Sequence, residues 1–261
     1  MISVRSFLVR GLLAGLVAGI VAFGVAYVVG EPSINAAIAL EESGAGHSHA
    51  DGSGHAAGGE PGSEVPRSLQ STAGLLTATA VAGTTLGGLI GVLSALALGR
   101  FGTLGVRGST LLVAGIGFVS LYVLPFVAYP PNPPAVGSAD TIGTRTTLYL
   151  ATVAVSVIAA VAAVLVGRRL ATRIGAWWAG LAAIAGYLTV TLGAVALLPR
   201  YDEVPTDFPA SVLYSFRTGS FVTSLALWAV LGVGLAELAH RLVRAARPAD
   251  RSAARPDAVL T

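Results

Sequence analysis

The sequence predicts an all-α protein: a polytopic membrane helix bundle of about six transmembrane helices with both termini in the cytoplasm. Of its 261 residues, 54% are hydrophobic and only 11% are charged, whereas a soluble domain carries about a quarter charged residues. The mean hydropathy is +0.77. Six apolar stretches approach or exceed the length of about 20 residues that a helix needs to cross a bilayer. They are Gly11–Val29, Ala73–Leu98, Thr110–Ala128, Thr147–Val166, Ala176–Leu198 and Ser220–Leu238.

The arginine distribution predicts how these spans are oriented. All 16 basic residues are arginine, and basic residues concentrate in cytoplasmic connections. Twelve fall on one side of the predicted bundle: Arg5, Arg10, Arg100, Arg107, Arg168, Arg169, Arg173, Arg241, Arg244, Arg247, Arg251 and Arg255. Four fall on the other side: Arg67, Arg145, Arg200 and Arg217. The sides alternate without a break, so we expect a multi-pass protein of the inner membrane whose three long polar connections face outward.

We expect residues 1–240 to form the transmembrane bundle, with residues 31–72 inserted as an external His-rich loop. Residues 241–261 are predicted to be a disordered, Arg-rich cytoplasmic tail. The first span is predicted to stay uncleaved, because its apolar run exceeds that of a signal peptide. The loop opens with Glu31-Pro32, a helix stop signal, and continues with apolar residues at helical spacing. This pattern predicts a short amphipathic helix lying on the outer surface.

Glycine recurs every four residues in each of the first two spans. The positions are Gly11, Gly15 and Gly19 in the first span and Gly83, Gly87 and Gly91 in the second. This spacing leaves bare backbone along one helix stripe, which allows another helix to approach closely. We expect the first two spans to pack tightly, either with each other or with a partner.

Two later segments of the chain resemble one another. The third span ends at Leu124-Pro125 and the fourth opens with Arg145-Thr146, while the fifth ends at Leu198-Pro199 and the sixth opens with Arg217-Thr218. We interpret them as two related helix hairpins, with the first hairpin as a looser third copy. Internal repeats are common in transport proteins.

Three of the four histidines lie within nine residues of the first outer loop. His47, His49 and His55, with Asp51 among them, combine imidazoles and a carboxylate on a Gly-rich backbone. Neutral imidazole is a good ligand for Co, Ni, Cu and Zn. We interpret the segment as a capture site for a divalent metal. The alternative is a solvated low-complexity loop in which histidine is incidental.

A second group of candidates is acidic. Glu31, Asp202, Glu203 and Asp207 lie in the predicted outer connections and are candidates for an acidic mouth that concentrates cations. The alternative is that these acids pair with arginines at the membrane edge.

The last span carries a third candidate, Glu237 and His240, spaced as in di-metal helix bundles. That motif occurs there in two copies, and here it is single. The alternative role for Glu237 is an ion pair with Arg241, four residues further on.

Several classes of function are excluded by what the sequence lacks. It has no Cys, no nucleotide-binding loop and no hydrolase or zincin arrangement, so we expect neither an enzyme nor a permanently bound cofactor. The arginines mark membrane edges instead of a soluble face, so nucleic acid is not expected as a partner. Spans one to five lack Asp, Glu, His and Lys, so a cation path would use hydroxyls and the carbonyls freed near Pro125 and Pro199, or would be shared with another subunit. The hydroxyls considered are Thr77, Thr79, Thr84, Thr85, Thr189 and Thr191.

Three segments resemble the CbtA family, the predicted cobalt transporter subunit. They are Gly30-Glu31-Pro32 followed by Ala37–Glu42, Pro130–Gly137 leading to Thr141–Thr146, and Asp207–Ala210 leading to Phe216-Arg217. The resemblance runs from the N-terminus to about Trp228. It implies a membrane subunit for cobalt uptake linked to cobalamin synthesis, beside a small single-span, His-bearing partner, CbtB.

The sequence therefore leads to one main hypothesis and one alternative. The main hypothesis is uptake of Co²⁺ as substrate, with Ni²⁺ and Zn²⁺ left open because an imidazole set cannot select among them. The alternative is a metal-sensing or assembly membrane protein that binds metal without transporting it. A homo-oligomer is compatible with both.

Overall fold

The computed structural model describes residues 3–48, 66–102, 104–134, 136–199, 201 and 203–246. All regular secondary structure within these ranges is helical, which confirms the predicted fold class. Six helical segments are long and apolar enough to cross a membrane. They are Val4–Ser43, Arg67–Ala97, Val106–Ala128, Ile142–Ile174, Ala176–Leu197 and Ala210–Ala245.

The individual elements divide these segments further. The α-helices are α1 (Val4–Val25), α2 (Glu31–Ser48), α3 (Arg67–Leu69), α4 (Leu75–Ala97), α5 (Val106–Phe118), α6 (Leu124–Ala128), α7 (Ile142–Ile174), α8 (Ala176–Leu197) and α9 (Ala210–Ala245). Three π-helical turns, η1 (Ala26–Gly30), η2 (Gln70–Gly74) and η3 (Val119–Val123), join α1 to α2, α3 to α4 and α5 to α6. A 3₁₀ turn, η4 (Ala139–Thr141), precedes α7.

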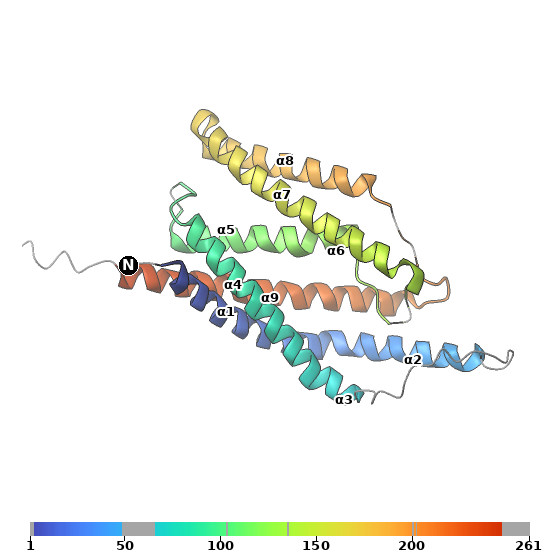
Figure 1. Ribbon diagram of the computed structural model, residues 1–261. Coiled ribbons are helices and arrows are strands. Elements are labelled where there is room, and N and C mark those ends of the chain that lie inside the picture. The colour runs from blue at the N-terminus through green and yellow to red at the C-terminus, as the bar shows by residue number, and fades with distance from the viewer. Residues whose placement is uncertain are drawn as a thin grey trace, which may run out of the picture.

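The first helix does not stop at Glu31-Pro32, and the expectation of a separate helix on the outer surface is wrong. Figure 1 shows α2 in line with α1, so residues 31–48 project from the end of the first span. A proline inside a helix supplies no N–H, and its ring crowds the preceding turn. Here that turn is η1, where the Glu31 N–H donates to the Ala26 carbonyl, five residues back. The wider π turn accommodates the proline and lets the helix continue.

The same device occurs before Pro125. The Leu124 N–H donates to the Val119 carbonyl across η3, and α6 continues through Pro125. Two helices of the bundle are therefore interrupted by a π turn with a proline two residues after its end.

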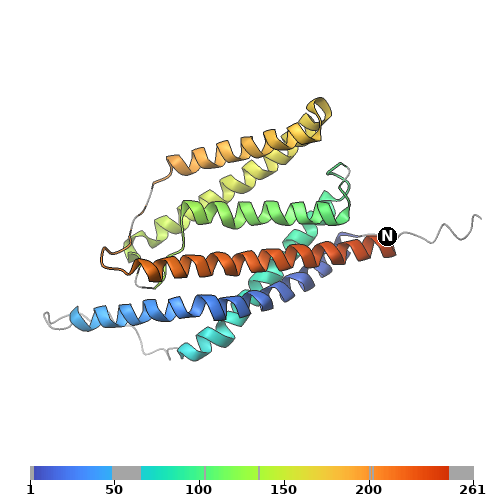
Figure 2. The ribbon, with the colours of Figure 1, turned by 180° about the vertical axis from the view of Figure 1, so that it is seen from behind.

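The glycines of the first two spans meet each other, which is one of the two arrangements that the spacing allowed. A Cβ atom added at Gly11 would lie 2.1 Å from the Gly87 carbonyl oxygen, and one at Gly15 would lie 2.1 Å from that of Gly83. At Gly19 the nearest carbonyl, that of Thr79, would be 2.4 Å away. Both views of the ribbon show α4 crossing α1 along this contact (Figure 1, Figure 2). The two backbones touch directly, so no side chain fits between them.

The core of the bundle lies where α9 packs on α1 and α5. It contains small residues of α1 and large ones of α9, with contributions from α4 and α5. Its buried members include Ala14, Ala18, Ala22, Ile90, Val113, Leu227, Trp228, Leu231 and Leu235. The hairpin of α7 and α8 stands at the periphery (Figure 1). α8 packs mainly on α7, where the hydroxyls of Ser156 and Tyr187 lie 2.7 Å apart.

The expected division of the chain at residues 240 and 241 stays a prediction. α9 continues to Ala245, and residues 247–261 lie outside the described part of the chain.

The glycine contact yields a direct prediction. We expect Gly15→Leu to destabilise the folded protein by more than the ~1–3 kcal/mol of ordinary overpacking, because the new side chain meets backbone that cannot rotate away. Thermal unfolding of the purified protein in detergent measures this. Gly24→Leu on the same helix is the matched control, since nothing lies within 4 Å of an added Cβ there. Equal midpoints for the two variants would contradict the contact.

Candidate functional site

A cavity of about 680 Å³ opens at the end of the bundle where the first helix passes from α1 to α2. We call this the outer end, following the orientation that the arginines predict. The walls come from η1 and α2, from η3 and α6, and from α7 and α9. Both π turns that precede a proline therefore line the same cavity.

The lining combines aromatic rings, hydroxyls and a few charged groups. The aromatic side chains are Tyr122, Phe126, Tyr129, Tyr149 and Phe216. Hydroxyl groups come from Thr146, Ser220, Thr223 and Ser224, and the other polar side chains are Glu31, Arg145 and Asn132. The buried hydroxyl of Tyr122 lies beside the Ser224 side chain. The cavity is thus polar enough to hold water, although most of its wall is apolar.

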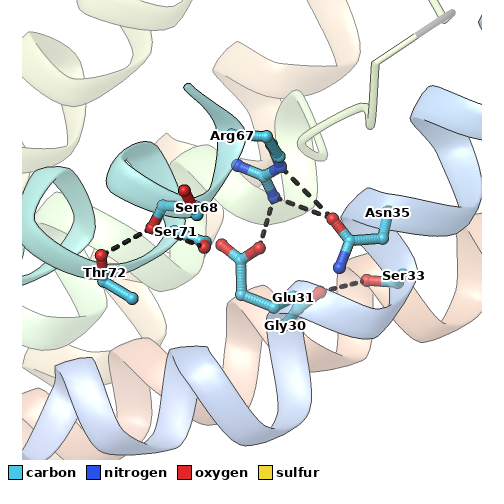
Figure 3. Close-up of polar contacts among 8 residues, drawn as sticks. All are labelled: Gly30, Glu31, Ser33, Asn35, Arg67, Ser68, Ser71 and Thr72. Atoms are coloured by element: carbon cyan, nitrogen blue, oxygen red, sulfur yellow. Dashed lines mark hydrogen bonds and ion pairs between the residues drawn. The ribbon is translucent and has the colours of Figure 1, made fainter. Parts of the chain in front are cut away.

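Glu31, one of the predicted acidic-mouth residues, stands at the edge of this cavity and is engaged in an ion pair. Its carboxylate is nearly buried and accepts a hydrogen bond from Arg67 of α3. The Arg67 Nε and Nη2 atoms also donate to Asn35 Oδ1, at 3.3 and 3.2 Å. Figure 3 shows the Arg67 guanidinium reaching across from α3 to both side chains on α2. The pair therefore fastens the two ends of the His-bearing segment, residues 32–66, to each other.

Glu203 joins the two later outer connections. Its carboxylate accepts hydrogen bonds from the Thr141 hydroxyl, from the Ser138 N–H at 3.1 Å and from Arg145 Nη1 at 2.6 Å. These contacts, with the Thr141 hydroxyl contributing most, hold the pKa of Glu203 below its ordinary value of 4.5. The acid acts as a clasp between residues 138–145 and its own connection. This arrangement is the ion-pair alternative considered for the acidic mouth.

The two related hairpins bind each other through the arginines that open their second helices. Arg145 of α7 binds Glu203 in the connection before α9. Arg217 of α9 donates in turn to the Pro131 carbonyl at 3.3 Å and to Asn132 Oδ1 at 3.0 Å, in the connection before α7. The arginine of each Arg-Thr motif thus binds the outer connection of the other hairpin.

Of the two remaining acidic candidates, the structure describes only one. Asp207 is exposed and has no partner within the described ranges, whereas Asp202 lies outside them.

Glu237, at the opposite end of α9, pairs with two arginines. Its Oε1 accepts from Arg241 Nε at 2.8 Å, as the i+4 spacing predicted. Its Oε2 accepts from Arg107 Nε and Nη2 at 3.0 and 2.6 Å, a contact across 130 residues that the sequence pattern did not indicate. Both oxygens thus face cations, so a metal ion there would have to displace an arginine. His240 lies half-buried one turn further on.

The predicted capture site falls largely outside the described part of the chain. His47 lies in the last turn of the α2 backbone, and His49, Asp51 and His55 are beyond the described residues. Among the residues that the structure describes, no group of three His, Asp or Glu side chains could hold a metal ion.

Sequence reasoning missed the hydroxyls that line the cavity from α9. Ser220, Thr223 and Ser224 are spaced i, i+3 and i+4 in an apolar span, which places them on one helix face. That spacing is the signal that could have found them. Of the hydroxyls proposed for a cation path, those of Thr79, Thr189 and Thr191 donate to carbonyls of their own helices.

The Glu203 clasp predicts a pH dependence. Because the folded-state pKa is depressed, the clasp stabilises the fold fully above about pH 4.5, and this contribution is lost as pH falls through the folded-state pKa. We therefore expect the thermal midpoint of the wild type to fall more steeply below about pH 4.5 than that of Glu203→Gln. Asp207→Asn, which removes an unpaired acid from the same connection, is the control and should keep the wild-type profile. Parallel profiles for Glu203→Gln and the wild type would refute the clasp.

Comparison with known proteins extends over almost the whole chain. The sequence model of one family, described as "Probable cobalt transporter subunit (CbtA)", matches residues 4–240. No curated protein and no solved structure matches the chain. With its six membrane-crossing helices and a match over nearly its full length, the chain belongs to the CbtA family of probable cobalt transporter subunits.

Proposed function

We propose that this chain is the inner-membrane subunit of a Co²⁺ uptake transporter, in which His47, His49, His55 and Asp51 capture the ion outside. Family membership supports cobalt transport and points away from enzymatic activity. The observation that carries the proposal further is the position of the cavity, which lies at the base of the His-bearing segment. Glu31 belongs to both, since it lines the cavity and anchors the segment.

The Glu31–Arg67 ion pair supports a short transfer path. It fixes both ends of residues 32–66 at the cavity edge, so an ion bound on this segment stays tethered near the opening. Along α2, His47 lies 16 residues beyond Glu31, which corresponds to about 24 Å of helix.

The chemistry of the cavity suits passage more than storage. A cation with six water molecules needs roughly 180 Å³, at about 30 Å³ per water, which fits within the 680 Å³ available. Hydroxyls and aromatic faces can contact such an ion, but the two charged groups in the wall, Glu31 and Arg145, are already paired. Weak binding of this kind lets an ion leave as readily as it enters. The acidic candidates Asp202 and Asp207 would add a negative field outside the cavity.

An aromatic cluster adjoins the cavity through Tyr122 and Phe126, and we propose that it blocks passage toward the inner end. Phe118 stacks on Tyr122 with ring centroids 5.9 Å apart and packs against Trp228 at 6.0 Å. Phe126 and Phe221 meet edge to face at 5.6 Å. Passage of an ion therefore requires these rings to move or a path shared with another subunit. We propose a small single-span, His-bearing subunit of the CbtB type for that role.

The closed aromatic cluster also favours the alternative function. A membrane protein that binds metal and signals to a partner, or assists its assembly, needs no open path through its own helices. Reconstitution of the pure chain into liposomes separates the two. Flux of Co²⁺ into the vesicles supports a carrier, whereas binding without flux supports a sensor or a subunit that depends on its partner.

The capture role leads to a prediction for cells. With His47→Ala, His49→Ala and His55→Ala combined, we expect the Co²⁺ concentration for half-maximal uptake to rise by about tenfold, equivalent to about 1.4 kcal/mol of lost capture. Uptake at saturating Co²⁺ should change little. Radioactive cobalt uptake measures both quantities.

His240→Ala is the matched control, because it removes the one histidine outside the capture segment. It should leave half-saturation unchanged. If the triple variant takes up limiting cobalt as well as the wild type does, the histidine segment has no part in the mechanism.

A further inference from the structure

The turn between α7 and α8, at the inner end of the bundle, concentrates unpaired positive charge. Arg168, Arg169 and Arg173 are exposed and form no ion pair with any residue that the structure describes. Some other arginines of the inner end are engaged within the protein. Arg107 and Arg241 share Glu237, and Arg100, which follows α4, donates to the Leu96 carbonyl of that helix.

Within the described part of the chain, the three charges have no counter-ion. Arg169 and Arg173 are spaced i, i+4 on α7, so their like charges face each other on adjacent turns and repel. Neither α7 nor α8 contains an acidic residue. The helix dipole offsets part of this repulsion near Arg173. An anion from outside the chain would offset the rest.

The surface around these arginines is amphipathic. A shallow hollow of about 790 Å³ is lined by the apolar Leu165, Val166 and Leu170 and by the three arginines. Leu165 and Val166 precede the arginines on the membrane side of α7, and Leu170 lies among the arginines. The hollow thus offers an apolar wall beside a cationic rim.

Two tryptophans mark the depth of this edge in the membrane. Gly175, with φ of +83°, reverses the chain between the two helices. Trp177 and Trp178 follow at once and are 74% and 65% exposed. Exposed tryptophan is typical of the level of the lipid headgroups. The arginines therefore stand at the depth where lipid phosphates lie.

Little other protein covers this part of the hairpin. α8 packs mainly on α7, and α7 meets the rest of the bundle through α6, η3 and η4, all toward the outer end. Both ribbon views show the α7–α8 turn standing apart from α5 (Figure 1, Figure 2). No other element in the described part of the chain packs extensively on this region, so the hollow is open to lipid.

We infer that the α7–α8 turn binds an anionic phospholipid of the cytoplasmic leaflet. The phosphate lies on Arg168, Arg169 and Arg173, whose planar guanidinium groups match phosphate geometry, and the acyl chains lie along the apolar wall. The cytoplasmic leaflet is rich in anionic lipid and attracts such basic clusters. This inference does not depend on the transported ion. It assigns the lipid a role in holding the peripheral hairpin in place.

The test uses the full chain in phosphatidylcholine nanodiscs with and without phosphatidylglycerol, and it measures the thermal midpoint together with lipid retention by native mass spectrometry. We expect phosphatidylglycerol to raise the wild-type midpoint and to be retained in preference to phosphatidylcholine. Arg169→Gln with Arg173→Gln should weaken that retention by about tenfold or more, at roughly fivefold per arginine. Arg169→Lys with Arg173→Lys should restore most of it.

Arg5→Gln with Arg244→Gln is the matched control, because it removes two exposed, unpaired arginines of the inner end outside the cluster. It should keep the wild-type response. If both glutamine variants lost phosphatidylglycerol retention equally, the lipid would be responding to general surface charge, and the assignment would be overturned. So would a midpoint shift by inorganic phosphate as large as that by the lipid, which would indicate a soluble anion. A wild-type protein with no preference for phosphatidylglycerol overturns it without any variant.

Discussion

Direct contact between the backbones of α1 and α4 is the constraint on which the rest of the bundle depends. Because glycine faces glycine at Gly11, Gly15 and Gly87, the helices approach until carbonyl oxygens of one touch the Cα groups of the other. Lipid provides no hydrophobic drive between helices, so such close packing is a main source of their association. With α1 fixed, α9 can lie along it, and Gly219 of α9 comes against the Val29 carbonyl at η1. That second close approach forms one wall of the outer cavity.

The cavity itself follows from two prolines. At Pro32 and Pro125 a helix must continue without one of its backbone hydrogen bonds, and in both cases a π turn takes up the mismatch. A π turn widens the helix locally and displaces the side chains around it. η1 and η3 both lie at the outer end. The two widened turns therefore border one space, which neighbouring side chains do not fill. The proposed passage of Co²⁺ depends on this space.

Charge at the outer end serves mainly to hold connections together. Arg67, Arg145 and Arg217 each bind a group in an outer connection, and Glu31 and Glu203 are the acids that they engage. Desolvation at the membrane edge makes an unpaired charge costly, which favours such pairing. At the inner end Arg168, Arg169 and Arg173 form a cluster without an ion pair among the described residues, since no acid lies on α7 or α8. Lipid phosphate binds this cluster in our proposal.

The sequence by itself determined the helical class and the six spans. It also predicted tight packing of the first two spans, with each other or with a partner, and offered the Glu237–Arg241 pair as one of two roles for Glu237. Each of these follows from composition or from spacing along one helix, and so depends only on residues close together in the sequence. Only the tertiary structure decided that α2 continues α1, that Arg107 also reaches Glu237, that Arg145 and Arg217 exchange partners between hairpins, and that hydroxyls of α9 face a cavity. These features depend on which distant segments meet and on how a π turn absorbs a proline. The spacing of the α9 hydroxyls places them on one helix face, but no periodicity along a single segment encodes what that face meets or the other contacts.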